Sequence, residues 1–127
     1  MSATQSNIGV GGTGTFSTSS AQTVIETESI PENSAGKIES LVSARRVSDG
    51  AVKVFKIEAG FKRDSGDIEV FGISVNALGT TLDLVALATA NVTIDSDADL
   101  LRVRATGLSA QAIDWSANLT GVTVNHE

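Results

Sequence analysis

The chain of 127 residues contains no cysteine and no tyrosine, one proline and one histidine, His126, at the penultimate position. Without cysteine, neither disulfides nor thiolate-bound metals can stabilise the fold. A single histidine and no thiol leave few of the groups that enzymes use for acid–base or nucleophilic chemistry. We therefore expect a protein that is not an enzyme, with no catalytic residue, no cofactor and no metal.

Aromatic residues are also scarce, at 4% of a chain that is 41% hydrophobic, so the core must consist of Val, Ile, Leu and Ala. Oligomerisation is a common way to supplement such a core. No apolar run approaches the ~20 residues of a membrane-spanning helix. The first twelve residues lack the basic start and apolar stretch of a secretory signal. We expect a protein made in a cytoplasm, without a signal peptide and without a membrane partner.

Basic residues are outnumbered, because 15 acidic and 9 basic side chains give a formal net charge of −6. Proteins bind nucleic acid largely by neutralising its phosphates, and an acidic chain is poorly suited to that. A net negative charge instead keeps a surface protein soluble and separate from its neighbours. The charge balance therefore predicts no nucleic-acid partner.

Residues 1–22 carry no charge and consist mostly of Ser, Thr, Gly, Gln and Asn. This composition is typical of a flexible arm. Three apolar residues, Ile8, Val10 and Phe16, are more than a pure linker needs, and burial on a neighbouring subunit would order the arm. We predict an extended Gly/Ser/Thr-rich N-terminal arm over 1–22, with these three residues as an assembly interface, and a β-sandwich domain over 23–127.

The stretch Ala51–Arg63 shows the clearest pattern in the chain, because apolar residues alternate with mostly charged ones from Phe55 onward. Successive side chains of a strand point to opposite faces, so this segment has one apolar face and one polar face. We predict a central, half-buried antiparallel strand. Trp115 lies on a similar alternating face near the C-terminus. The predicted core residues are Phe55, Ile57, Phe61 and Trp115.

Further strands are predicted wherever apolar residues alternate between turn signals, and only the stretch Leu78–Ala90 is ambiguous between a loop and a loop with one helical turn. Turns every 8–12 residues without a long helix indicate an all-β antiparallel β-sandwich or jelly roll. In the strand that follows the central one, Phe71, Ile73 and Val75 are expected on one face. The further strands are expected within Val24–Ser29, Lys37–Arg46, Ile68–Val75, Ala90–Asp95, Leu101–Ala105, Ile113–Leu119 and Val122–Val124.

Two motifs match known ligand sites in letter only. Gly9–Gly14 matches G-x-G-x-x-G, but the nucleotide-binding version needs a helix after it, and a Ser/Thr-rich segment follows here. Asp95–Asp99 resembles the opening of a calcium loop, but Leu100 and Thr106 occupy the positions of the required Gly and Glu. We interpret Asp95–Asp99 as a hairpin turn lined by carboxylates, and a weak calcium site completed by another chain is the alternative.

Four arginines, Arg45, Arg46, Arg102 and Arg104, allow a basic patch. In an acidic protein made of strands, such residues more often form a solvated face. The alternative is that they pair with Glu58 and Glu69 across neighbouring strands. Neither interpretation requires a ligand.

Three segments together resemble a pattern of tailed-bacteriophage virion proteins: Ser43–Arg46 (SARR), Phe55–Arg63 (FKIEAGFKR) and Ile113–Ala117 (IDWSA). The proteins that share this pattern look like decoration, appendage or fibre-tip modules of trimeric β-sandwich type. The resemblance covers roughly residues 37–119 and omits the arm. It departs from the pattern at Asp114, where relatives tend to carry a basic residue.

The resemblance implies a non-enzymatic structural protein on the virion surface, made in the host cytoplasm. Its implied partners are copies of itself, as a trimer, and the major capsid protein or other virion proteins. We favour a capsid-surface decoration protein, because the chain is short, lacks a shaft-forming repeat or coiled coil, and has an uncharged arm. The alternatives are a tail or fibre-tip module that contacts the host surface, and a carbohydrate-binding β-sandwich, for which aromatic residues are few.

Overall fold

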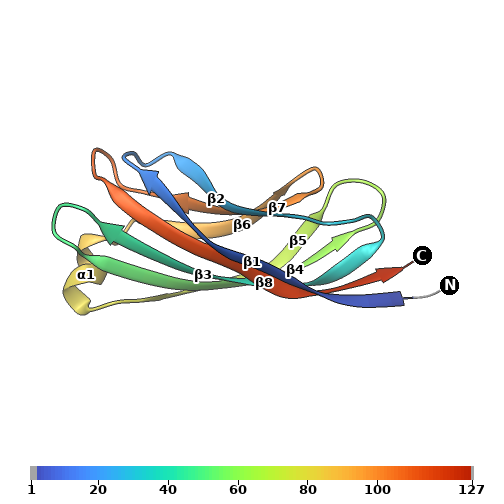
Figure 1. The fold of residues 1–127 in the computed structure, drawn as a ribbon. Helices are drawn as coiled ribbons and strands as arrows, with labels where there is room; N and C mark the ends of the chain where they lie inside the picture. Colours follow the sequence, from blue (N-terminus) through green and yellow to red (C-terminus); the bar gives the residue numbers. More distant parts are fainter. Residues whose placement is uncertain (1–2, 127) are drawn as a thin grey trace.

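The computed structural model describes residues 3–126, and the side chains of residues 16–125. It shows two antiparallel sheets that face each other as an all-β sandwich, as the sequence predicts (Figure 1). The five-stranded sheet has the order β1-β8-β3-β4-β5, and the three-stranded sheet has the order β2-β7-β6. The elements are β1 (Ala3–Ser17), β2 (Gln22–Ser29), β3 (Ser34–Arg46), β4 (Val52–Arg63), β5 (Glu69–Leu78), α1 (Thr81–Ala86), β6 (Asn91–Asp97), β7 (Leu100–Thr106) and β8 (Ile113–His126).

Strand β4 is internal, between β3 and β5, and its alternating pattern places one face in the core. Phe55, Ile57 and Phe61 are at most 3% exposed, whereas Lys56 and Lys62 are exposed on the opposite face. The period-two alternation in the sequence therefore correctly predicts which face of β4 is buried.

The core is aliphatic except for three buried aromatic side chains. The rings of Phe55 and Trp115 stack with their centroids 6.3 Å apart and their planes 23° apart. Stacked aromatic pairs contribute about 0.5–1.5 kcal/mol beyond the area that they bury. The Trp115 Nε1–H donates to the Ser17 Oγ at 2.8 Å, which satisfies the buried indole and ties β8 to the end of β1. Trp115, like the other three residues predicted for the core, is buried.

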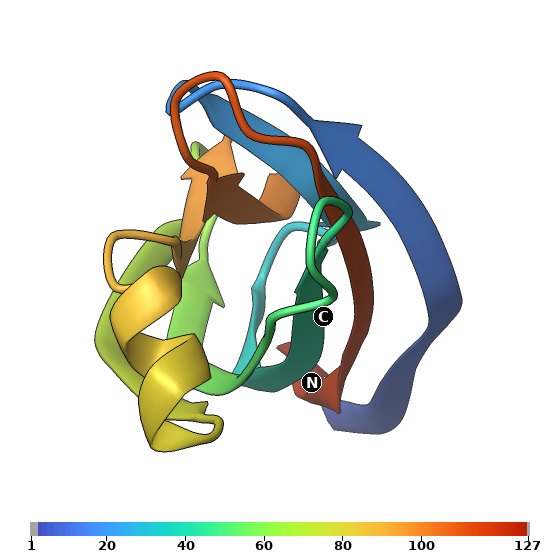
Figure 2. The same ribbon diagram turned by 90° about the vertical axis from the view of Figure 1, so that its left-hand side faces the viewer.

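The predicted N-terminal arm is extended, and residues 3–17 of it form strand β1. This strand pairs with β8 from Ala3↔His126 to Ser17↔Ile113. The register shifts between Val10 and Thr13, so two glycines lie in a β-bulge, where their backbone freedom is useful. The arm is therefore an edge strand of the five-stranded sheet, which adds a strand to the domain predicted to begin at residue 23 (Figure 2).

Strands β3 and β8 approach each other closely where a glycine replaces a side chain. Gly121 lies opposite Ile38, and a Cβ at Gly121 would lie only 2.2 Å from the Lys37 carbonyl oxygen. Larger residues at Gly121 would therefore push the two strands apart at the centre of the sheet.

The predicted shared face of Phe71, Ile73 and Val75 is wrong, because β5 contains a bulge. Glu58 pairs with Ser74, but Gly60 pairs with Phe71, so β5 has one more residue than β4 in this interval. Gly72 has a φ of +65°, a left-handed conformation that glycine adopts without strain. The Phe71 ring consequently lies over Gly60 on the outer face, 2.4 Å from where a Cβ of Gly60 would be.

The ambiguous stretch after β5 contains the short helix α1, which begins after the cap residue Thr80. Buried Lys53 of β4 donates from its Nζ to the carbonyl oxygens of Ala90 at 2.7 Å and Leu87 at 3.2 Å. Burial lowers the pKa of Lys53. The ammonium group therefore satisfies carbonyls at the end of α1 and fastens the connection to β6. In the described part of the chain, no helix is long and apolar enough to cross a membrane.

Candidate functional site: assembly surfaces

The three segments that carry the sequence resemblance lie on neighbouring strands. Ser43–Arg46 belongs to β3, Phe55–Arg63 to β4 and Ile113–Ala117 to β8, and the sheet order places β3 between the other two. In this register Ala44 lies opposite Trp115. The resemblance therefore describes one continuous piece of the five-stranded sheet, although its segments are far apart in the sequence.

The predicted assembly residues all lie on edge strand β1. Phe16 is 56% exposed, so half of this aromatic side chain is available to a partner. The side chains of Ile8 and Val10 lie outside the described residues. Their role in assembly stays a prediction.

A second surface, which the sequence analysis missed, lies at the opposite edge of the same sheet. We call it the β5–α1 surface and define it by six exposed apolar residues on β5 and α1. Leu78 is 68% exposed and Leu82 is 82% exposed, which are high values for leucine side chains. The signal in the sequence is the uncharged run Phe71–Leu82. The six residues are Phe71, Ile73, Val75, Leu78, Leu82 and Val85.

A shallow depression of about 410 Å³ adjoins the β5–α1 surface on the outer face of the five-stranded sheet. Leu78 forms one side of it, and Leu41, which is 58% exposed, forms part of the floor across β4. Phe55 also lines the depression but is only 3% exposed. Its further lining residues include Ser43, Val54, Lys56, Ser116 and Asn118.

The acidic segment Asp95–Asp99 is only partly a turn. The predicted hairpin turn is present between β6 and β7, but it comprises only residues 98–99, and Asp95 and Asp97 belong to β6. Both oxygens of Asp95 accept hydrogen bonds from Arg102, at 2.9 and 3.0 Å, and Arg104 donates to one of them at 2.9 Å. Burial opposes ionisation of Asp95, but the hydrogen bonds from the two arginines outweigh it and lower its pKa.

The arginines do not form one basic patch, because Arg45 and Arg46 lie on β3 and the other two on β7 of the opposite sheet. The predicted alternative partner Glu58 is bound instead by Lys37 at 3.0 Å. Hydrogen bonding from Lys37 lowers the pKa of Glu58. Arg46, Arg102 and Arg104 therefore bind carboxylates close to them in the fold: Arg46 binds Asp49 in the turn after β3, and the other two bind Asp95 on β6.

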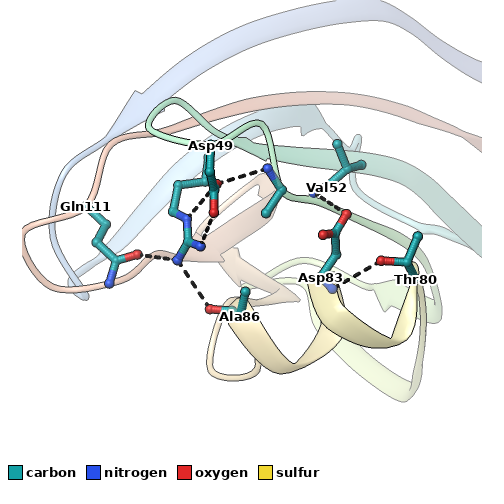
Figure 3. A network of polar contacts seen from close by, with 8 residues as sticks. Asp49, Val52, Thr80, Asp83, Ala86 and Gln111 are labelled. Carbon is teal, nitrogen blue, oxygen red and sulfur yellow. Dashed lines mark hydrogen bonds and ion pairs between the residues drawn. The ribbon is translucent and has the colours of Figure 1, made fainter.

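Arg46 joins three segments at the end of the sandwich that carries α1 (Figure 3). Its guanidinium donates from Nε to the Asp49 Oδ1 at 3.0 Å and from Nη1 to the Gln111 Oε1 at 2.8 Å. Beside it, the Asp83 carboxylate of α1 accepts from the Val52 N–H at 3.1 Å. Hydrogen bonding from Arg46 lowers the pKa of Asp49 to about 2. This network holds α1 and its loop against β4, and so fixes one end of the β5–α1 surface.

No protein-family model matches the sequence, and no curated protein matches it. Among solved structures, the chain is similar to part of the tailspike protein of Acinetobacter baumannii phage AM24, with a TM-score of 0.46 and 10% sequence identity. The similarity covers 97% of this chain and 26% of the tailspike chain. The chain thus spans about a quarter of the length of that protein.

Proposed function

We propose that the chain is a non-enzymatic structural protein of a tailed-phage virion, and specifically a decoration protein on the capsid surface. One observation carries this proposal: the three segments that resemble tailed-phage virion proteins form adjacent strands β8, β3 and β4. Ala44 lies opposite Trp115, and the Trp115 ring stacks on the ring of Phe55. Because the matching residues contact one another in the fold, the resemblance concerns a structural unit rather than three separate short matches.

The charged side chains with the best-defined partners support a structural role. Asp95 is held by two arginines, Asp49 by Arg46, and Lys53 by main-chain carbonyls. Each of these contacts joins two segments of the fold. Perturbed pKa values also mark catalytic sites, but here hydrogen bonds from neighbouring arginines lower the pKa values of Asp95 and Asp49, and burial lowers that of Lys53.

The choice of the capsid surface is supported by the composition of the chain. The 127 residues contain no repeat of the kind that builds a fibre shaft. In this proposal the partners are copies of the chain and the major capsid protein or other virion proteins. The uncharged edge strand β1, with Phe16 half exposed, is available to lie along such a neighbour.

The experiment that tests the proposal is a count of copies per purified particle by quantitative mass spectrometry. A capsid-surface protein follows the capsid lattice, so we expect on the order of hundreds of copies. A tail or fibre-tip module would give a few to a few tens of copies, about one symmetric ring or its multiples. Its absence from purified particles would contradict a virion role altogether. Antibody labelling in electron microscopy then locates the protein independently of the count.

A further inference from the structure

Strand β5 carries large apolar side chains on both of its faces although it stands at the edge of a sheet. Phe71 and Leu78 lie opposite Gly60 and Val54 on the outer face, whereas Val75 lies opposite the buried Ile57. A strand with one solvated face normally alternates between apolar and polar residues. Ser74 and Asn76 of the outer face follow that alternation, but Phe71 and Leu78 break it with large apolar side chains.

The outer edge of β5 also lacks most of the features that prevent pairing with another chain. Natural edge strands are protected by charged residues, proline, bulges or a covering segment. The run Phe71–Leu82 has neither charge nor proline, and the single bulge at Gly72 leaves Ile73–Leu78 regular. Among the described strands, β5 pairs only with β4. The unpaired main-chain groups of β5 and its exposed apolar side chains therefore lie along the same edge.

We propose that the β5–α1 surface binds a second copy of this chain, which deepens the proposed function by naming the partner of this face. Charge supports a second copy as the occupant. Each copy carries a net charge of −6, so two copies repel each other unless they meet where charge is absent. The twelve residues Phe71–Leu82 supply that place. A partner recognised by charge would instead require charged groups along this run.

The size of the surface fits an interface between two copies. The exposed fractions of the six defining side chains correspond to about 600 Å² of mostly apolar surface. Phe71 and Leu78 lie on the outer face of β5 and Val75 on the inner face, so these side chains flank the unpaired edge of β5 from both faces. A standard stable interface buries about 800 Å² on each partner, of which somewhat more than half is apolar. The adjoining depression beside Leu78 extends the surface further.

Strands β5 and β1 are opposite edges of the five-stranded sheet, and Figure 2 shows β5 and α1 on one side of the sandwich and β1 on the other. Assembly through β5 therefore leaves the edge of β1 free. One copy can bind its twin through β5 and a different virion protein through β1 at the same time.

The test measures the mass of the full-length chain across a concentration series by sedimentation velocity and light scattering. We expect association in the wild-type chain and at least about tenfold weaker association in Leu78→Lys/Leu82→Lys, because charge is then placed in a dry contact. The matched control is Val122→Lys. Val122 is 43% exposed on β8, which strands β3 and β4 separate from β5, and its substitution should leave the mass unchanged. Circular dichroism confirms that each variant is folded.

A second measurement uses smaller substitutions, so that its result does not depend on whether the lysine variants fold. Because the chain has no cysteine, Leu82→Cys and Val122→Cys each introduce a single thiol. We expect the thiol at position 82 to react at least about tenfold more slowly with a maleimide above the association concentration than below it. The thiol at position 122 should react equally at both. A wild-type chain that stays monomeric at high concentration, or equal reactivity at position 82, overturns the proposal.

The outcome is independent of the particle assay. Association that depends on Leu78 and Leu82, in a protein that is absent from purified particles, would support this interface and contradict the virion role. Particles that carry the protein while it stays monomeric in solution and keeps position 82 reactive would support the role and contradict the interface.

Discussion

The two edge strands of the five-stranded sheet carry almost no charge, since β1 has none and β5 has only Glu69, yet they differ in composition. Strand β1 is rich in glycine and small polar residues and has a bulge near its middle. Strand β5 carries large apolar side chains on both faces and is followed by α1 with two more. Among the side chains that the structure describes, those of β5 and α1 combine this scarcity of charge with a large exposed apolar surface.

This difference teaches which property matters for assembly. Unpaired main-chain groups are common to all edge strands, so they do not distinguish one edge from the other. Burial of apolar surface supplies most of the driving force for association. The composition of residues 1–22 predicts an assembly interface on the arm, whereas the exposed apolar side chains of the folded chain indicate one on β5. The predictions that follow separate the two edges, beginning with the largest expected effect.

Deleting residues 1–22 should have the largest effect on stability. The truncation removes strand β1, leaves β8 as an unprotected edge, and takes the Ser17 acceptor from the buried Trp115 indole. We expect the truncated chain to lose most of the stability of a domain of this kind, which is about 5–15 kcal/mol. Thermal and urea unfolding of the full-length and truncated proteins measure the loss.

The full-length variant Ser17→Ala is the control, because it removes only the Trp115 hydrogen bond, with an expected loss of about 1–2 kcal/mol. A truncated chain that is as stable as the full-length one would show that β1 is dispensable. In that case the independent docking arm predicted from composition would be the better description.

The second prediction compares two phenylalanines across the pairing of β4 with β5. Phe61 is fully buried, so Phe61→Ala should cost about 3–5 kcal/mol in urea unfolding. Phe71 is 51% exposed and covers Gly60, so Phe71→Ala should cost clearly less, about 1 kcal/mol. A larger loss for Phe61→Ala than for Phe71→Ala, measured in dilute solution, would show that only the inner face of β5 packs against a core. Equal losses would mean that Phe71 is already part of a core in the single chain.

The elements of this fold are largely predictable, because the alternation of period two is strong in β4, β7 and β8. Such alternation depends only on which face of each strand is buried, and the sequence records that directly. The all-β class and the burial of Phe55 and Trp115 follow from it. Sheet order does not follow, since nothing local indicates that β8 lies between β1 and β3.

The errors have local physical causes. A bulge adds one residue to a strand without leaving a mark in its composition. The sequence therefore does not show that Phe71 and Ile73 point to opposite faces of the sheet. The partners of Arg102 and Arg104 depend on which strands are neighbours: Asp95 lies opposite Arg102 only because β6 pairs with β7. The exposure of Leu78 and Leu82 likewise depends on β5 being an edge. The pairing of the strands, which the pattern within one segment does not record, decides all three.

The third prediction concerns Lys53, whose buried ammonium group fastens the segment that follows α1. Lys53→Met keeps the packing on Phe55 but leaves the carbonyls of Leu87 and Ala90 without this donor. We expect a loss of about 1–3 kcal/mol in unfolding free energy and faster amide exchange in residues 81–90. Lys56→Met, on the exposed face of the same strand, should change stability by less than about 1 kcal/mol. Equal effects at the two positions would contradict the fastening role.

The smallest expected effect is the acid response of Asp49. Hydrogen bonds from Arg46, and then from the Ala51 N–H, lower the pKa of Asp49 from 3.8 to about 2. A carboxyl group whose pKa is lower in the folded state contributes stability above its unfolded pKa, and that stability is lost as the pH falls through the folded pKa. Between about pH 4 and pH 2, the stability of Asp49→Asn should therefore fall less steeply than that of the wild type. Urea unfolding at several pH values measures both slopes, and Arg46→Gln should flatten the profile in the same way. Combining the two substitutions should add almost nothing, because each alone already removes the ion pair. If their effects on the slope were additive, Arg46 would not be the group that lowers the pKa of Asp49.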